Sequence, residues 1–460
     1  MRAAAILASA LLVVARVALA EVDLALVLAK TYAENPRLLA ARAELRATDE
    51  RIPEARAGMR PHVVARSGMF LREVDTGSGS RSLVTLDDRL SLSQTVFDGG
   101  LTAARVAGAE AEVRSGRAEL VRLTQEVLLE AVAAYAAVVR DQQLLERALA
   151  NEQRLQEVLT GAKQRYRLGA ASRTDVAQAE TRWAEARALR RQAEGQLEIS
   201  GAAFRRVIGD PPGALAPPEL PPGLPSDLAA ALAAVPEHPA YLAASEAVEA
   251  ARQEVRATRA GLRPRVEFSG SYGLAREAEA GEGFRGEAAV GAVLTWPLYQ
   301  GGGEYARIRR SHQLESAARL RLAEVERQLR EEITAAFEAL SAARDASAAV
   351  HVQLRAAELA VEGVREELRA GTRTVMDLLD AERDLFAAQR AMIEARHAEV
   401  VAGWRLLAAI GGLLPERLGL SVATYDPAAY TRAVRDAWYG SEPPRSGADE
   451  PPLDGPEQKG

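Results

Sequence analysis

Residues 101–168 read LTAARVAGAEAEVRSGRAELVRLTQEVLLEAVAAYAAVVRDQQLLERALANEQRLQEVLTGAKQRYRL, a run of 68 residues without a proline. Residues 303–370 form a second proline-free run of the same length. Alanine, leucine, glutamate, arginine and glutamine dominate both runs, and these residues are strong helix formers. A helix of this size is about 100 Å long, roughly three times the hydrocarbon thickness of a bilayer. The two runs therefore predict two rods that are too long for an ordinary globular domain.

The two runs belong to an internal repeat in which residues 24–209 recur as residues 227–411. Over most of each copy, adding 202 to a residue number gives the equivalent position, and nearer the start of each copy the offset is 203. The equivalent pairs include Gly99 and Gly301, Gly100 and Gly302, and Gly169 and Gly371. A constant register of this kind indicates two copies of one structural unit.

Each copy is expected to contain the same elements in the same order. The first copy (residues 21–209) should hold a helix at 24–58, a strand pair at 62–97, the long helix at 101–168 and a return helix at 172–209. The second copy (227–411) should hold a helix at 227–262, a strand pair at 264–299, the long helix at 303–370 and a return helix at 374–411. A proline-rich linker (210–226) joins the copies. A C-terminal extension (412–439) then leads to a tail (440–460) whose composition predicts disorder.

The expected strands alternate between apolar and polar residues. One such segment has apolar residues at 266, 268 and 272 and polar residues at 267, 269 and 271. Strands of about ten residues with one apolar and one polar face are typical of a transmembrane barrel with a wet interior. Four strands cannot close a barrel alone, so this interpretation requires partners. An ordinary soluble sandwich sheet, which would need a second layer, is the alternative.

The return helices carry apolar residues at alternating spacings of three and four. Between residues 176 and 207, eight of the ten positions with this spacing are apolar, and between 378 and 409 nine of ten are. Such a sustained spacing is the pattern of a coiled-coil seam. The sequence therefore predicts that each return helix packs along a long helix.

The composition excludes several classes of function. The chain has no cysteine, so disulfides, thiolate metal sites, thiol catalysis and N-terminal lipidation are excluded. Its net charge is −6 and no basic block predicts a nucleic-acid partner. Five scattered histidines lack ligand spacing, so neither a metal nor a cofactor is expected. The run Gly301-Gly302-Gly303 lacks the Gly-Lys-Ser/Thr of a phosphate-binding loop, and no catalytic arrangement of side chains predicts an enzyme.

Residues 1–20 are predicted to form a secretory signal peptide. Arg2 is followed by apolar or small residues from Ala3 to Ala15, and Ala18-Leu19-Ala20 is a cleavage motif. A short buried helix is the alternative. No other stretch approaches the roughly 18 apolar residues of a transmembrane helix. If the chain spans a membrane, it is therefore expected to do so as a β-barrel.

These elements together resemble the TolC family of outer-membrane channels over residues 21–440. The segment from Gly371 to Ala381 and the turns at 97–100 and 299–302 carry the resemblance most strongly. The resemblance implies an α+β homotrimer in the outer membrane of a Gram-negative bacterium. Three protomers would each contribute four strands to one transmembrane β-barrel in lipid, and their long helices would continue it as a coiled-coil tunnel through the periplasm.

The segments Tyr425-Asp426-Pro427 and Arg435-Asp436-Ala437-Trp438 are similar to extensions in the type I secretion branch of that family. This resemblance implies a passive conduit that docks with a periplasmic adaptor protein and an inner-membrane ABC transporter. The alternative branch is multidrug efflux with a proton-driven pump. A soluble periplasmic coiled-coil scaffold is the alternative from a different class, and it would have no use for strands with an apolar face.

The resemblance also assigns candidate gate residues. Arg373 matches the family's gate arginine, and Asp175 matches the carboxylate that pairs with it, whereas the companion gate tyrosine falls at Leu368. Asp377 and Asp380 match the acidic ring at the periplasmic constriction; they are three residues apart and share a helix face. For Asp175 and Asp377 a helix-capping role is an equal alternative, because Ser172-x-x-Asp175 and Thr374-x-x-Asp377 are capping-box-like patterns.

The turns between the long and return helices are the expected adaptor contacts. They comprise Arg167, Leu168 and Gly169 in the first copy and Arg369, Ala370 and Gly371 in the second. Helix capping by glycine is the alternative interpretation, and both can hold. The pairs Gly99-Gly100 and Gly301-Gly302 are expected to form strand-to-helix turns.

Overall fold

The computed structural model describes residues 22–75, 79–277 and 285–444. The predicted signal peptide, the tips of the two strand pairs and the tail beyond residue 444 lie outside these ranges. Among the described helices, none combines the length and the hydropathy of a membrane span.

The chain divides into two compact units. We call the described parts of 42–119, 240–325 and 425–460 the strand unit. The described parts of 1–41, 120–239 and 326–424 are the hairpin unit. Each unit takes segments from both copies of the repeat, so neither copy folds as a unit of its own.

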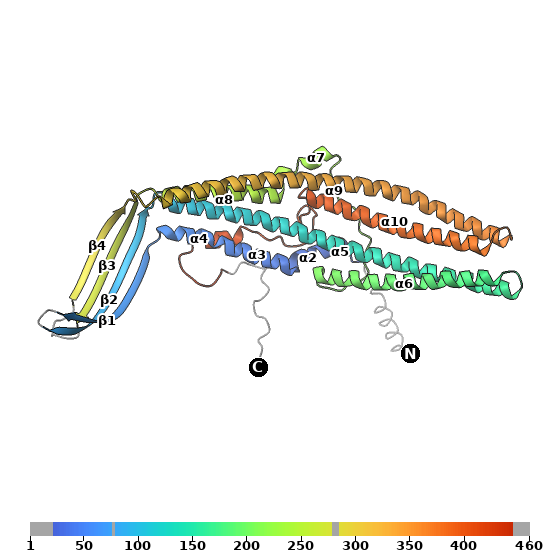
Figure 1. Ribbon diagram of the computed structural model, residues 1–460, viewed down its shortest axis with the longest axis horizontal. Coiled ribbons are helices and arrows are strands. Elements are labelled where there is room, and N and C mark those ends of the chain that lie inside the picture. Colours follow the sequence, from blue (N-terminus) through green and yellow to red (C-terminus); the bar gives the residue numbers. More distant parts are fainter. Residues whose placement is uncertain (1–21, 76–78, 278–284, 445–460) are drawn as a thin grey trace, which may run out of the picture. The chain divides into compact units, whose positions relative to one another are not determined.

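The strand unit contains one four-stranded antiparallel sheet (Figure 1). Its strands are β1 (His62–Asp75), β2 (Ser80–Phe97), β3 (Arg265–Glu277) and β4 (Arg285–Thr295), in the order β1-β2-β3-β4. The two strand pairs thus join side by side, with β2 of the first copy against β3 of the second.

The register places most of the apolar residues of the four strands on one face of the sheet. Ala65 pairs with Leu90, Leu90 with Tyr272, and Tyr272 with Ala288. Directly paired residues project from the same face. The opposite face carries the polar run in which Ser91 pairs with Ser271. The predicted alternation is therefore confirmed, and it extends across the junction of the two copies.

Strand β4 ends earlier than the pattern of apolar residues predicts. The strand pair was expected to reach residue 299, but β4 stops at Thr295. Pro297 has no backbone N–H to donate to a ladder, and it restricts Trp296 before it. The apolar side chains of Trp296, Leu298 and Tyr299 therefore lie beyond the sheet, where they are exposed.

The first helix of each copy is broken, although each was expected to be continuous. The first copy has α2 (Leu24–Glu34), α3 (Pro36–Asp49), α4 (Arg51–Arg56) and the 3-10 turn η1 (Ala57–Met59). The second has α7 (Leu228–Leu232), η2 (Val235–Glu237) and α8 (Pro239–Ala260). In both copies a proline opens the next helix, and it holds the preceding Asn35 and His238 in an extended conformation, with ψ of 123° and 134°.

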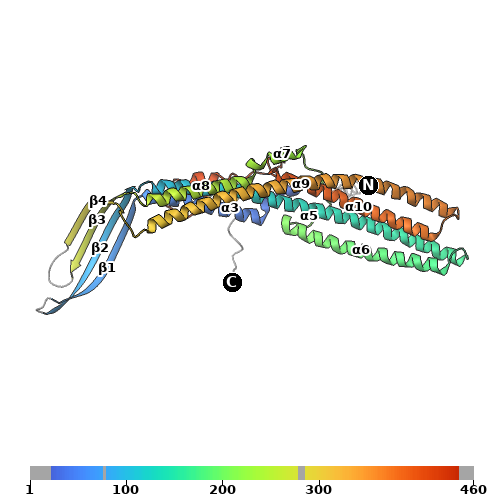
Figure 2. The ribbon, with the colours of Figure 1, turned by 45° about the horizontal axis from the view of Figure 1, so that its top comes forward.

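The long helices match the prediction within a residue or two at each end. They are α5 (Leu101–Arg167) and α9 (Gly303–Arg369), followed by the return helices α6 (Arg173–Ile208) and α10 (Val375–Ala409). A short helix, α11 (Ala429–Val434), lies in the C-terminal extension. Both views show α6 alongside α5 and α10 alongside α9 (Figures 1 and 2). The predicted packing of return helices on long helices is thus confirmed.

The hairpin unit has apolar side chains between its helices. One buried cluster combines α5, α6 and α10 through Leu155, Leu159, Ala162, Ala179, Ala186, Val375 and Leu379. Alanines in this cluster allow the close approach of helices that the sequence predicts. The two helical hairpins of the chain therefore share one core here.

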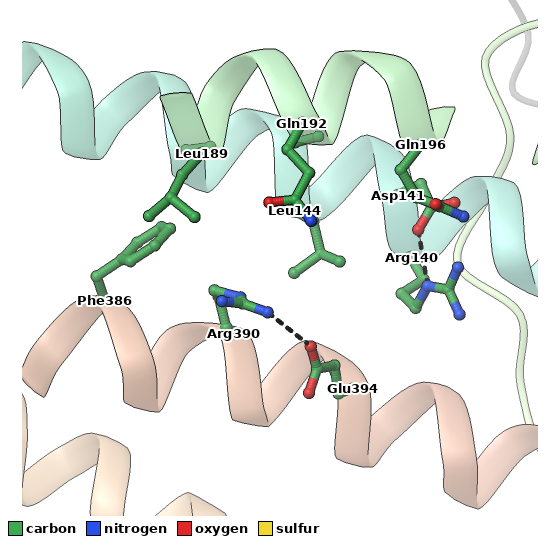
Figure 3. Close-up of a pocket in the computed structure, with 11 residues that line it drawn as sticks. Arg140, Asp141, Leu144, Leu189, Gln192, Gln196, Phe386, Arg390 and Glu394 are labelled. Atoms are coloured by element: carbon green, nitrogen blue, oxygen red, sulfur yellow. Dashed lines mark hydrogen bonds and ion pairs between the residues drawn. The ribbon is translucent and has the colours of Figure 1, made fainter. Parts of the chain in front are cut away.

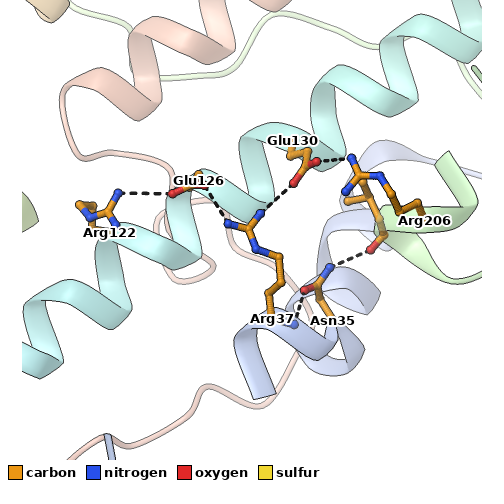
Figure 4. Close-up of polar contacts among 7 residues, drawn as sticks. Asn35, Arg37, Arg122, Glu126, Glu130 and Arg206 are labelled. Atoms are coloured by element: carbon orange, nitrogen blue, oxygen red, sulfur yellow. Dashed lines mark hydrogen bonds and ion pairs between the residues drawn. The ribbon is translucent and has the colours of Figure 1, made fainter. Parts of the chain in front are cut away.

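Elsewhere in the hairpin unit a polar network connects the start of α3 and the end of α6 to the middle of α5 (Figure 4). Arg37 donates to Glu126 at 2.9 Å and to Glu130 at 3.1 Å, and Arg206 also binds Glu130. The buried amide of Asn35 donates to the Val207 carbonyl at 2.9 Å. The carboxylate of Glu126 has a lowered pKa, mainly because Arg37 donates a hydrogen bond to it.

Candidate functional site

The turns at the ends of the hairpins share one backbone geometry. Gly169 and Gly371 have φ angles of 77° and 79°, which favour glycine. The next amide in each turn reaches back into the long helix: Ala170 N donates to Arg165 O at 2.8 Å, and Thr372 N to Glu367 O at 2.9 Å. This is glycine capping of α5 and α9, as the alternative interpretation predicted.

Both return helices start with a complete capping box. Asp175 accepts from Ser172 N at 2.8 Å, and Asp175 N donates to Ser172 Oγ at 3.0 Å. Asp377 and Thr374 make the same exchange at 2.9 and 3.2 Å. The predicted capping role of Asp175 and Asp377 is thus confirmed. Hydrogen bonds from Thr374 also lower the pKa of Asp377, with a smaller contribution from Arg373.

Arg373 finds its partners within its own hairpin. Its Nε lies 2.8 Å from Glu367 Oε2, and its Nη1 lies 3.9 Å from Asp377 Oδ1. The hydrogen bond to Glu367 is the main cause of the raised pKa of Arg373. Within the described residues, no ion pair joins Arg373 to Asp175 of the same chain. The gate pairing therefore stays a prediction, and it would have to form with another protomer or after a rearrangement.

Asp380 does pair across the two hairpins. Arg182 of α6 lies 3.7 Å from Asp380 of α10, and the Asp380 side chain is half exposed. Arg182 was not among the residues singled out from the sequence. The contact connects one return helix to the other close to the turns, so Asp380 has a defined partner besides its predicted place in an acidic ring.

Glu382 makes one contact across the hairpins and another within its own hairpin. This carboxylate of α10 is buried, with 1% exposure, and lies 3.2 Å from Arg154 Nε of α5. It also accepts a short hydrogen bond from Arg365 of α9. The equivalent Glu180 of the first copy is exposed. The sequence does indicate that Glu382 is buried, because it lies within an apolar stripe that comprises Val375, Leu378, Leu379, Leu385 and Phe386.

A groove with a volume of about 310 Å³ runs between α5, α6 and α10 in the same unit (Figure 3). Leu144, Leu189 and Phe386 form its apolar part. Its charged groups are paired, because Arg140 contacts the buried Asp141 at 2.7 Å and Arg390 contacts Glu394 at 3.3 Å. Nowhere in the described ranges do three histidine or acidic side chains gather as a metal site would require.

The strand-to-helix turns have the predicted glycine conformation, with positive φ at Gly99, Gly100, Gly301 and Gly302. At Gly99 the backbone also comes close to a neighbour: an added Cβ would lie 2.5 Å from Arg263 Cβ. Arg263 Nη1 donates to the Gly99 carbonyl at 2.8 Å. This contact attaches the turn after β2 to the residue that precedes β3 by two positions.

Comparison with known proteins agrees with this architecture. The profile of the outer membrane efflux protein family matches residues 27–210 and 233–412, which are the two copies of the repeat. The outer membrane efflux protein BepC of Brucella suis is 35% identical over 444 residues, which cover 96% of each chain. The alkaline protease secretion protein AprF of Pseudomonas aeruginosa is 26% identical, over 71% of this chain and 69% of that one.

The fold has solved counterparts. The Campylobacter jejuni CmeC outer membrane channel has a TM-score of 0.76 at 14% identity, over 90% of this chain and 89% of that one. The sheet of four antiparallel strands, the paired long helices and the two-copy repeat thus fit a known channel fold. The chain belongs to the outer membrane efflux protein family.

Proposed function

We propose that three copies of this chain form an outer-membrane channel, with one β-barrel built from their sheets and one tunnel built from their helices. The observation that carries the proposal is the mainly apolar face that the four strands share, on which Ala65, Leu90, Tyr272 and Ala288 form one row across the sheet. In the single chain this face is uncovered, with Met69 76% and Val290 89% exposed. The outer edges of β1 and β4 also lack a neighbouring strand among the described residues. Closure with further copies pairs both edges, and lipid covers the apolar face.

Disulfide trapping tests this closure directly, because the natural chain has no competing cysteine. Pairs of cysteines are placed in β1 and β4, with Val64→Cys or Arg66→Cys combined with Ala289→Cys. Oxidation should give covalent trimers on non-reducing gels. The matched control is Ser91→Cys with Ser271→Cys, since these residues pair within one chain and should give no intermolecular product. Only monomers from every β1–β4 pair would contradict the barrel.

Size and location give a second test. The detergent-extracted protein should have the mass of three chains by light scattering, and it should fractionate with the outer membrane. Recovery as a monomer in the soluble periplasm would instead support the coiled-coil scaffold.

The channel is proposed to serve type I secretion. The C-terminal segment 425–440 supports this branch, as does the similarity to a protease secretion protein. Co-expression with a candidate ABC transporter and adaptor should then restore export of a protein that carries a C-terminal secretion signal. The similarity to an efflux protein over nearly the whole chain supports the alternative. Drug resistance with a proton-driven pump, without protein export, would decide for that alternative.

The hairpin turns are proposed to bind the periplasmic adaptor. Leu168 supports this, because a leucine with 84% exposure at a turn gains from being covered by a partner. Replacement of Leu168 by Asp should abolish export without reducing the trimer yield. Asp at the equivalent Ala370, which presents far less apolar surface, tests the second turn and should reduce export less. Unchanged export in Leu168→Asp would exclude this contact.

A further inference from the structure

The end of the C-terminal extension forms an ordered strap along the strand unit. We call residues 425–439 the C-terminal strap. The Arg42 guanidinium lies over the Tyr425 ring, 5.1 Å from its centre, and the Tyr430 hydroxyl donates to Glu50 at 2.8 Å. Burial and the contact with Glu50 raise the pKa of Tyr430 to about 12.

The strap runs in the same direction as the helices beneath it. After Tyr430, Asp436 binds Arg56, and the Ala437 carbonyl accepts from Arg60 Nη1 at 2.5 Å. The partners of the strap thus follow the order of α3, α4 and η1 toward the start of β1. A second row of contacts comes from α5, where Arg117 donates to Thr431 at 2.7 Å.

The strap ends with two aromatic residues, Trp438 and Tyr439, near the start of β1. Arg60 lies over the Trp438 ring at 5.0 Å, and it precedes β1 by only two residues. Despite this contact Trp438 is 65% exposed, and Tyr439 is 96% exposed. Other exposed aromatic residues follow or end the neighbouring strands, namely Phe97, Trp296 and Tyr299. Trp438 and Tyr439 therefore extend the set of aromatic residues at one end of the strands.

We propose that Trp438 and Tyr439 bind the phospholipid headgroup region on the side of the membrane where the long helices begin. Tryptophan and tyrosine favour this region because their rings are partly apolar and still carry a hydrogen-bond donor. The guanidinium of Arg60 sits beside them and attracts lipid phosphate. The strap is thus a lipid anchor that joins the C-terminal extension to the bilayer. This inference rests on the proposed barrel, because the barrel sets the level of the membrane.

Fluorescence quenching in lipid nanodiscs tests the anchor. The chain has four tryptophans, Trp183, Trp296, Trp404 and Trp438, so variants with three of them replaced by Phe report on single positions. The nanodiscs contain phosphatidylethanolamine and phosphatidylglycerol, with nitroxides placed either on the headgroup or deep in the acyl chain. The variant that keeps Trp438 should be quenched strongly by the headgroup nitroxide and weakly by the deep one. The variant that keeps Trp183, in α6, should be quenched by neither.

The variant that keeps Trp296 separates this inference from the proposed function. If Trp296 is quenched and Trp438 is not, the barrel stands and the anchor is wrong. If neither is quenched, the membrane position of the sheet is itself wrong. Shielding of Trp438 from aqueous acrylamide without any quenching by lipid would mean that a protein covers it, which also overturns the anchor. Finally, Arg60→Ala should reduce the quenching of Trp438 by lipid and leave that of Trp296 unchanged.

Discussion

The two hairpin turns have the same backbone and different charges. Between residues 163 and 178 the first turn has four basic side chains and one acidic side chain, a net charge of +3. The equivalent residues 365–380 have three basic and four acidic side chains, a net charge of −1. The capping glycine and the capping box are nevertheless present in both. The repeat thus keeps the residues that shape the turn and varies the charged residues around it.

The contacts between the hairpins also use residues in which the copies differ, because the equivalents of Arg154 and Asp380 are Ala356 and Gln178. Arg182 comes from the first hairpin and Asp380 from the second, and they pair at 3.7 Å. Arg154 and Glu382 likewise join the two. Two identical hairpins would repel each other at their turns, whereas these two are complementary. Variants at equivalent positions can therefore separate what the copies share from what distinguishes them.

The largest effect is expected from proline in the long helices, where the two copies should respond alike. Ala134 and Ala336 are equivalent residues, and both are buried. Proline at either position removes a backbone hydrogen bond and clashes with the preceding turn, at a cost of about 3 kcal/mol or more per chain. Both variants should lose trimer yield and melt at a lower temperature.

Glycine at the same two positions is the control, because it should cost only about 1 kcal/mol. A normal yield and melting temperature in one of the two proline variants would show that the long helices are not equivalent parts of one assembly.

The next largest effect on stability should differ between the two copies of the repeat. Glu382→Gln removes the charge that holds Arg154 and Arg365, whereas Glu180→Gln changes an exposed residue. Removing one partner of a buried ion pair costs 3–5 kcal/mol, and because both arginines are partly exposed we expect about 2 kcal/mol here. Thermal unfolding should show a clear decrease for Glu382→Gln and almost none for Glu180→Gln. Equal decreases would mean that the ion pairs of the buried Glu382 contribute no more stability than an exposed carboxylate does.

The sequence predicts what depends on neighbouring residues and misses what depends on how helices face each other. Gly169, Gly371 and the two capping boxes act within a few residues, so the sequence could offer their capping roles as alternatives, and the structure confirms those roles. The break at Asn35 was missed although Pro36 signals it, because the apolar pattern continues on both sides. The pairing of Glu382 with Arg154 was out of reach, since it depends on the rotation of α10 against α5.

For the sheet, too, the sequence predicts features within a strand and misses those that depend on distant segments. Alternation within each strand predicted its apolar face correctly, because that pattern is a property of the strand alone. The junction of β2 with β3 could not be read from the sequence, since 167 residues separate Phe97 from Arg265. The register between them then decides that both apolar patterns lie on one face.

A smaller difference between the copies concerns pH. Asn35 and His238 occupy equivalent positions, and both are buried. Burial, helped by the charge of Arg122, lowers the pKa of His238, although a hydrogen bond to the backbone of Ala408 partly opposes this. The unfolded chain therefore binds a proton more readily than the folded one at this residue. Its contribution to stability is fully present above pH 6.5 and decreases as the pH falls below that value.

The variant His238→Asn copies the first repeat and has no group that titrates at this position. Melting temperatures from pH 8 to pH 5 should fall less steeply for this variant than for the natural chain. His397, whose pKa is also lowered by burial, remains in both proteins and so cancels in the comparison. Identical pH profiles would show that protonation of His238 does not oppose folding.

The smallest change in free energy per chain is expected at the candidate gate residues Arg373 and Asp175. Arg373 is exposed and contacts Glu367 and Asp377, so a single pair of this kind contributes little. In a trimer, however, three copies bias one open–closed equilibrium together. If Arg373 holds the channel shut through Asp175 of the other hairpin, Arg373→Ser should raise single-channel conductance in planar bilayers. Asp175→Asn should do the same.

A double variant with both Arg373→Ser and Asp175→Asn shows whether the two substitutions remove one shared contact or act separately. Because both substitutions remove one interaction, the double variant should conduct scarcely better than either single one. Leu368→Tyr should act in the opposite direction by supplying a hydroxyl beside the turn. Asp175 also caps α6, so the melting temperature of Asp175→Asn must be measured in parallel. A lower melting temperature with unchanged conductance would leave Asp175 as a helix cap, and Arg373 as a partner of its own hairpin only.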